Sequence, residues 1–289
     1  MKRVVSLSLF LGPQASRDAK DPFYYDFVRP WIRAHHNCFP DWELRVHHDA
    51  APGFLEACPY GLTLRRLAMH QTTGGGQPGV PLVRLVDCGP AELRNAAMLW
   101  RLKPLFEEDV EIVLCRDIDS IPTPRDRRAV EEFLTSGMEA HGIADSISHT
   151  SPLLGGMCGF LAAPFRQRFA WQDWDAMIRT CRQFMGSAWE KPGMDQSFLN
   201  GYLWPRVCGE SFLHRLKGRH PAHGGRIVRE HIWDRLPAGV PPEIVAGGDA
   251  WLAHLGASGF DWILSTEFYQ RHGRQDVERR IAAAEAAAG

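Results

Sequence analysis

The sequence predicts a single α/β domain built on a mostly parallel central sheet flanked by helices. Strand and helix patterns alternate along the first half of the chain, which is the order that parallel strands with right-handed crossovers require. The run Ile112–Cys115 is uniformly apolar, as expected for a strand buried on both faces. The 289 residues are 45% hydrophobic and 23% charged, a composition that leaves ample material for one core.

The expected elements follow one another in a regular order. Strands are predicted at Arg3–Leu11, Glu43–His47, Val80–Val86, Asp109–Cys115 and, more briefly, Ile143–Asp145. Helices are predicted at Phe23–His35, Gly61–His70, Gly89–Pro104, Arg125–Ser136, Phe165–Met185 and Met194–Leu203. The segment Val207–Gly248 is proline-rich and is predicted to be irregular. We place the domain at residues 1–270 and a helical, alanine-rich tail at residues 271–289.

The stretch Glu111–Pro122 is the centre of the functional prediction. Its apolar strand ends in Arg116, Asp117 and Asp119, and an i, i+2 spacing in extended backbone sends both carboxylates to the same side. Two such oxygen donors at the carboxyl edge of a buried strand suit a hard divalent cation and its phosphate ligands. Asp-x-Asp alone is a weak signal, and the alternative is a solvated turn.

Composition and charge exclude several classes of function. The formal net charge is −1, so no overall field draws the chain to nucleic acid or to an acidic membrane. The 7 cysteines include no Cys-x-x-Cys pair, which favours reduced thiols over a disulfide framework or a zinc site. The apolar run Val4–Leu11 is short for a signal peptide and no stretch is long enough to span a membrane. We therefore expect a cytoplasmic protein.

Four short blocks occur in a characteristic order between Arg3 and Gly256. They are Trp100-Arg101-Leu102, Arg116-Asp117-Ile118-Asp119-Ser120, Asp195-Gln196-Ser197-Phe198-Leu199-Asn200 and His254-Leu255-Gly256. Together they resemble metal-dependent nucleotide-sugar transferases of the GT-A fold, in the group of glycogenin and bacterial galactosyltransferases. The second block is similar to the Arg-Asp-x-Asp-Ser form of the metal motif in bacterial members.

The resemblance implies a divalent-metal-dependent glycosyltransferase that moves a sugar from a nucleoside-diphosphate donor, expected to be a UDP-sugar, to an acceptor hydroxyl. The implied cofactor is Mn²⁺, with Mg²⁺ as a substitute, held by Asp117, Asp119 and His254. Mixed carboxylate and imidazole ligation is compatible with manganese. For His254 the alternative is a structural histidine.

The donor would be surrounded by residues from several predicted elements. These are Phe10, Leu11, Gly12, Asp49, Arg94, Arg101, Arg116, Asp117 and Gly256. A planar guanidinium suits phosphate oxygens, although Arg94 could equally lie on a solvated helix face. Arg116 could contact the donor or only balance the charge of the neighbouring acids.

Asp195 and Gln196 are the candidate catalytic residues, with Gly155, Gly156 and Asp195 lining the sugar and acceptor pocket. In an inverting mechanism Asp195 accepts the acceptor proton, whereas in a retaining one it positions or stabilises. The alternative is that Asp195 only caps its helix. Glycine at 155 and 156 permits close approach of a ligand or of another backbone.

Two other functions remain open at the level of sequence. One is a catalytically weak GT-A domain that binds a nucleotide or a glycan without turnover. The other is a nucleotidyltransferase, although Leu11–Lys20 offers only one glycine where such enzymes carry a basic, glycine-rich loop. The basic segment Arg215–Arg229 is either a solvated loop or a contact for an anionic acceptor, such as a phosphorylated glycan, a lipid carrier or nucleic acid. The pairs His35-His36 and His47-His48 are predicted to lie at the surface.

Overall fold

The computed structural model describes residues 1–10, 31, 35, 38–49, 83–89, 94–118, 122, 124–144, 151–189, 191–216 and 225–231. Several predicted site residues therefore lie outside the described residues, namely Leu11, Gly12, Asp119, His254 and Gly256. The predicted tail and most of the segment Arg215–Arg229 also lie outside them.

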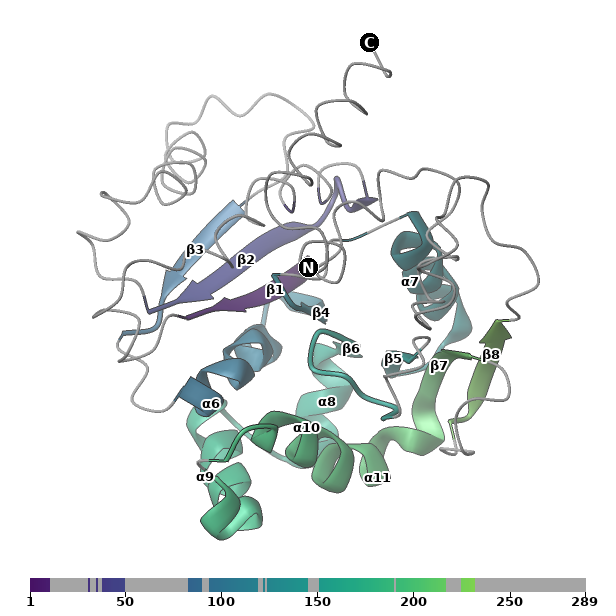
Figure 1. Ribbon diagram of the computed structural model, residues 1–289. Coiled ribbons are helices and arrows are strands. Elements are labelled where there is room, and N and C mark those ends of the chain that lie inside the picture. Colours follow the sequence, from purple (N-terminus) through teal and green to yellow (C-terminus); the bar gives the residue numbers. More distant parts are fainter. Residues whose placement is uncertain are drawn as a thin grey trace, which may run out of the picture.

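An eight-stranded sheet forms the centre of the protein (Figure 1). Its strands are β1 (Lys2–Leu9), β2 (Glu43–His48), β3 (Val83–Asp87), β4 (Val110–Arg116), β5 (Ala140–Ala144), β6 (Met157–Leu161), β7 (Ser211–Leu216) and β8 (Ile227–His231). The strand order is β3-β2-β1-β4-β6-β5-β7-β8. Only β6 runs antiparallel to its neighbours β4 and β5, and every other pairing is parallel. The predicted α/β class with a mostly parallel central sheet is confirmed.

The sheet reverses its order of growth beside β1. The chain passes from β1 to β2 and β3 in one direction and then returns to β4 on the other side of β1. Trp31, which precedes β2, packs on one face of the sheet, whereas Leu102, which precedes β4, packs on the other. In open α/β sheets such a point leaves a crevice outside the carboxyl ends of the strands, where ligands bind.

Apolar side chains cover both faces of the sheet, as the uninterrupted apolar runs of β1 and β4 require. On β1, Val5 and Leu7 belong to the cluster that also contains Trp31, whereas Val4 belongs to the opposite cluster. The first cluster includes α7 (Pro124–Ser136) through Phe133.

The second face is covered by several short helices (Figure 1). They are α6 (Arg94–Ala97), the 3₁₀ helix η1 (Met98–Phe106), α8 (Ala162–Phe169), α9 (Trp174–Met185) and α10 (Met194–Phe198). None of the helices in the described part of the chain combines the length and the apolarity needed to cross a bilayer.

The prediction of one long helix at Phe165–Met185 is wrong. The structure has α8 and α9 instead, separated by Ala170 in the left-handed region with φ 52°. Asp173 caps α9 by accepting a 2.7 Å hydrogen bond from the Ala176 N–H, and an N-cap aspartate favours a new helix start. The ring of Trp171 stacks on Phe169 with a centroid distance of 4.6 Å. Trp171 also stacks on Phe198 and Tyr202 with centroid distances of 6.2 and 5.9 Å, so contacts with a later part of the chain support the interruption between α8 and α9.

The helix predicted at Met194–Leu203 does not stop before Pro205. It continues from α10 through the π turn η3 (Leu199–Leu203) into α11 (Trp204–Val207). Pro205 falls in the first turn of α11, where the missing N–H costs little. The helix η1 likewise includes Pro104 and extends to Phe106, beyond its predicted end.

The prediction of an irregular segment after Val207 is wrong in two places, because β7 and β8 lie there. β7 pairs in parallel with β5, and β8 pairs in parallel with β7. These short segments do not alternate with helix patterns, and β5, the strand on which β7 pairs, lies far away in sequence. Strand formation depends strongly on such neighbours.

The predicted surface positions of His35, His47 and His48 are also wrong, since all three are buried. His47 Nδ1 lies 3.3 Å from Ser6 Oγ and 3.2 Å from the carbonyl oxygen of Leu7. The ring of His35 stacks on Trp31 with a centroid distance of 5.9 Å. β2 is buried along its whole length, so a histidine in it is buried regardless of its polarity.

Candidate active site

The candidate site lies where the carboxyl ends of β1 and β4 meet. Asp117 directly follows β4 and Phe10 directly follows β1. The indole Nε1–H of the fully buried Trp31 donates a 3.1 Å hydrogen bond to the carbonyl oxygen of Asp117. The main chain at Asp117 is therefore held by a residue from the face of the sheet that α7 also covers. The ring of Phe10 packs edge-on against Trp100 with a centroid distance of 6.2 Å.

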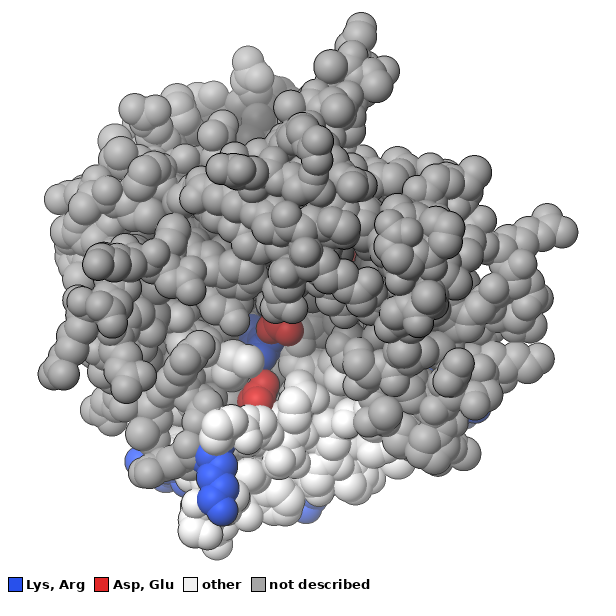
Figure 2. Space-filling model, in the orientation of Figure 1, with Lys and Arg blue, Asp and Glu red and all other residues white. Residues whose placement is uncertain are grey.

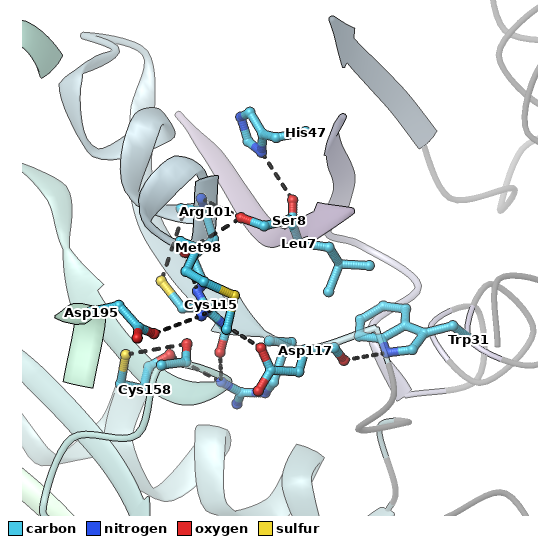
Figure 3. A network of polar contacts seen from close by, with 12 residues as sticks. Leu7, Ser8, Trp31, His47, Met98, Arg101, Cys115, Asp117, Cys158 and Asp195 are labelled. Atoms are coloured by element: carbon cyan, nitrogen blue, oxygen red, sulfur yellow. Dashed lines mark hydrogen bonds and ion pairs between the residues drawn. The ribbon is translucent and has the colours of Figure 1, made fainter. Parts of the chain in front are cut away.

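Arg101 forms the centre of the site (Figure 3). One terminal nitrogen donates to Asp117 Oδ1, and the other donates to Asp195 Oδ2 at 3.2 Å. Its Nε–H donates to the carbonyl oxygen of Met98 at 2.7 Å. Burial by itself lowers the pKa of Arg101, but the two carboxylates outweigh this effect and raise the pKa. The guanidinium is therefore a permanent cation enclosed between two acids.

The two acids differ in their exposure. The side chain of Asp117 is 39% exposed and that of Asp195 is 6% exposed. Burial raises the pKa of Asp195, whereas the nearby Arg101 acts in the opposite direction, and the net shift is upward. One carboxylate therefore faces the surface and could hold a ligand, and the other is a buried group whose charge depends on Arg101.

The alternative role of Asp195 as a helix cap is not observed. Gly193, with φ 77°, is the N-cap of α10, and Asp195 lies in the first turn. An acidic residue there is stabilised by the helix end, but its carboxylate is directed to Arg101. The position of Asp195 is therefore explained by the site rather than by capping.

The two glycines of the turn before β6 pass close to these charges. A Cβ on Gly155 would lie 2.7 Å from an Arg101 nitrogen and 3.0 Å from Asp195 Oδ2, and a Cβ on Gly156 would overlap Asp117 Oδ2. Neither glycine has a positive φ, so space rather than backbone conformation requires glycine here. The sequence predicted close approach of a ligand or of another part of the chain. The structure shows the glycine backbone close to the side chains of Arg101, Asp117 and Asp195.

Gln196 and Asn200 hold this turn in place. In the amide orientation that satisfies its neighbours, Gln196 accepts from the Gly155 N–H at 2.6 Å and donates to the Leu153 carbonyl at 3.1 Å. Asn200 accepts from the Leu153 N–H at 3.1 Å and donates to the Leu153 carbonyl at 2.8 Å. The two amides of the Asp-Gln-x-x-x-Asn pattern thus stabilise the glycine turn, because they form hydrogen bonds with its main chain.

Arg116 lies elsewhere than at the predicted donor site. It is fully buried, and its guanidinium donates to both carboxylate oxygens of Asp126 at 3.0 and 2.7 Å. It also donates to the carbonyl oxygens of Cys115 and Cys158. The acid that Arg116 pairs with is Asp126 of α7, and not the adjacent Asp117, which pairs with Arg101. Strand alternation explains this, because adjacent residues point to opposite faces.

The remaining predicted donor residues are only partly described. Asp49 follows β2 at the same edge of the sheet as Asp117, and Arg94 begins α6. The side chain of Arg94 lies outside the described residues. Sequence reasoning missed Ser8, whose hydroxyl accepts from the Arg101 N–H at 3.1 Å and so ties η1 to β1. An alternating Ser6-x-Ser8 pattern in an otherwise apolar strand was the available signal.

Asp117 is the one predicted metal ligand that the structure describes. Among the described residues, no three His, Cys, Asp or Glu side chains are grouped so as to hold a metal ion. The partly exposed carboxylate of Asp117 fits a hard cation as one oxygen ligand. Figure 2 shows acidic and basic side chains together in a hollow on this face.

Comparisons with known proteins add little to this geometry. No protein-family model matches the chain, and none of the curated protein sequences matches it. One solved structure found to be similar is the crystal structure of 4-diphosphocytidyl-2C-methyl-D-erythritol synthase from Anaerococcus prevotii DSM 20548. It is 9% identical, with 87% of this chain and 98% of that chain covered and a TM-score of 0.38. A likeness at this level carries no conclusion about activity, and the function has to be argued from the site itself.

Proposed function

We propose that the protein is a divalent-metal-dependent glycosyltransferase that moves a sugar from a nucleoside-diphosphate donor, expected to be a UDP-sugar, to a hydroxyl acceptor. The observation that supports this proposal best is the carboxylate of Asp117, which stands partly exposed beside the glycine turn at the point where the sheet reverses. The four sequence blocks that resemble GT-A glycosyltransferases are the second support. Three of these blocks come together in the fold, because Arg101 of the first contacts Asp117 of the second and Asp195 of the third.

In the proposed reaction, the glycosidic bond between the anomeric carbon and the diphosphate breaks, and negative charge grows on the leaving phosphate. A bound Mn²⁺ or Mg²⁺ would stabilise that charge as a Lewis acid. Asp117 would hold the ion together with Asp119 and His254, the two expected ligands outside the described residues.

The residues of the chain would divide the remaining work. The glycine turn allows the main chain to pass close to Arg101 and Asp117, which keeps these two side chains together beside the place where the sugar would lie. Asp195 is the acidic group on the other side of Arg101, and a raised pKa makes a carboxylate a better proton acceptor. In an inverting reaction it takes the acceptor proton, and in a retaining reaction it orients the acceptor. The anomeric configuration of the product, measured by NMR, distinguishes the two roles.

The function is tested by titrating the protein with nucleoside diphosphates in the presence and absence of Mn²⁺. Because a ligand selective for the folded state raises its stability, one diphosphate should raise Tm only when the metal is present. Hydrolysis or transfer from the matching nucleotide sugar should then disappear in EDTA and in Asp119→Ala. Binding without any turnover would instead assign a catalytically weak binding domain.

Asp117→Asn and Asp109→Asn make a matched pair for this test. Both aspartates flank β4, but Asp109 lies at the opposite end, exposed and paired with Lys2 at 2.6 Å. We expect Asp117→Asn to lower turnover by about a hundredfold or more, and Asp109→Asn to retain it. Equal activity of the two variants, or full activity in EDTA, would contradict the proposal.

The acceptor is tested separately through salt. If the segment Arg215–Arg229 contacts an anionic acceptor, the acceptor KM should rise steeply with ionic strength while the donor KM changes little. A salt-insensitive acceptor KM would indicate a neutral glycan. Among the described residues of this segment, Arg226 already forms an ion pair with Glu210 at 3.3 Å, which an anionic acceptor would have to compete with.

A further inference from the structure

The guanidinium of Arg101 has no face left for a phosphate. Its side chain is 3% exposed, and its three nitrogens contact Met98, Asp117 and Asp195 (Figure 3). A phosphate ligand would have to displace one of the two carboxylates. We propose that Arg101 is a positioning residue that fixes Asp117 and Asp195 relative to each other, and not a ligand of the donor diphosphate.

The chemistry of arginine suits this task. The planar guanidinium presents its donors in a rigid fork, so the two terminal nitrogens determine where two carboxylates lie. The acids come from separate parts of the chain, since Asp117 follows β4 and Asp195 lies in α10. Without the bridge, only the contacts of those elements would relate one acid to the other.

The main chain of Arg101 is anchored on both central strands, as a positioning residue requires. Its N–H donates to Ser8 Oγ of β1 at 3.1 Å. Its carbonyl oxygen accepts from Cys115 Sγ of β4 at 3.7 Å. The side chain of Arg101 therefore extends from a main chain that is fixed on β1 and β4.

The bridge also explains how Asp195 is kept inside the protein. A buried carboxylate is unfavourable unless it is paired and hydrogen-bonded, and Arg101 supplies that partner. Asp117 is partly exposed and retains access to a ligand. Arg101 thus connects the partly exposed carboxylate of Asp117 to the buried carboxylate of Asp195.

The decisive experiment is a double-mutant cycle on unfolding. Arg101→Gln, Asp195→Asn and the double variant are compared with the wild type by Tm and urea midpoint. Arg101→Gln leaves the buried Asp195 without its cation. We therefore expect this substitution to lower the free energy of unfolding strongly in the wild-type background and clearly less in the Asp195→Asn background. Additive losses would overturn the bridge. This cycle requires no turnover, so it remains decisive if the proposed function fails.

Arg101→Lys provides the kinetic test, which rests on the proposed function, and it covers the case in which Arg101→Gln does not fold. Lysine keeps the charge, but a single ammonium lacks the fork. We expect kcat to fall by about tenfold or more while the donor KM changes by less than about threefold. Arg166→Lys is the matched control, because Arg166 packs on the same helix through the carbonyl oxygens of Leu105 and Glu107 and contacts neither acid.

Two kinetic outcomes would exclude the bridge, and a third would refute the proposed function instead. A raised donor KM with unchanged kcat, together with weaker binding of Mn²⁺ and UDP, would make Arg101 a phosphate ligand. A lower Tm with both kinetic constants unchanged would make it only a packing residue. A wild type that neither binds Mn²⁺ and nucleotide nor turns over would refute the proposed function, and the unfolding cycle alone would then decide on the bridge.

Discussion

Among single residues, Gly156 shows how the absence of a side chain sets the position of a neighbouring carboxylate. Its main chain passes so close to Asp117 that a Cβ would overlap the carboxylate. The neighbouring Gly155 is confined by Arg101, Asp195 and Gln196. Neither glycine has a positive φ, so the surrounding side chains explain why glycine is needed here.

Gly156→Ala should therefore move the carboxylate of Asp117. Overpacking of this kind costs about 1–3 kcal/mol, and we expect the Mn²⁺-dependent rise in Tm with nucleotide to be lost as well. Gly209→Ala is the control, because a Cβ there meets nothing within 4 Å and its effect should stay within about 0.5 kcal/mol. Unchanged metal and nucleotide binding in Gly156→Ala would show that Asp117 does not have to stay where it lies.

At the level of helices and strands, α10 and η3 together hold the turn before β6 through hydrogen bonds. Gln196 lies in α10 and Asn200 in η3, four residues apart and thus on one side of the helix. Both amides pair with the main chain at Leu153 and Gly155. The helix is continuous from Met194 to Val207 through a π turn, a feature that is frequent at functional sites.

Asn200→Leu should loosen this turn. It leaves the Leu153 N–H without its side-chain acceptor, and an unpaired buried polar group costs about 1–3 kcal/mol. Urea unfolding measures the loss, and faster hydrogen exchange at Leu153 and Gly155 locates it. Gln183→Leu on the exposed side of α9 is the control. If Asn200→Leu left both exchange rates unchanged, the amide would not be holding the turn.

At the scale of the whole molecule, buried histidines make folding sensitive to acid. Burial lowers the pKa of His47 from its ordinary 6.5 to about 3, and the positive charges of Lys103, Arg45 and Arg84 act in the same direction. Burial also lowers the pKa of His48. Both side chains lie in β2, one of the strands beside β1.

The folded state therefore keeps His47 neutral over a range of pH in which the unfolded chain binds a proton. Its contribution to stability is complete above about pH 6.5 and is progressively lost as the pH falls toward 3. At about pH 4.5 this one group should cost on the order of 2–3 kcal/mol. Urea unfolding from pH 7.5 to 4.5 measures the slope, which should be shallower in His47→Gln. Parallel slopes in the two proteins would exclude His47 as the source.

Local pattern was enough to predict the parallel half of the sheet. The apolar runs of β1 and β4 and their alternation with helices needed no knowledge of distant contacts, and β1 to β4 were found within a few residues of their true ends. Predictions failed where a tertiary contact decides the local structure. Trp171, between α8 and α9, stacks on Phe198 and Tyr202 of a later helical segment, and β7 depends on its pairing with β5.

The candidate site shows the same division. Residue order alone places acids after a buried strand at Asp117, glycines at 155 and 156, and an acid and an amide at the start of a later helix. The folded arrangement was needed to show that Arg101 is enclosed between Asp117 and Asp195 and that Arg116 pairs with Asp126. The physical reason is that residue type and spacing govern backbone conformation over a few residues. The pairing of charges depends on which side chains the fold brings within hydrogen-bonding distance across 94 positions of sequence, as for Arg101 and Asp195.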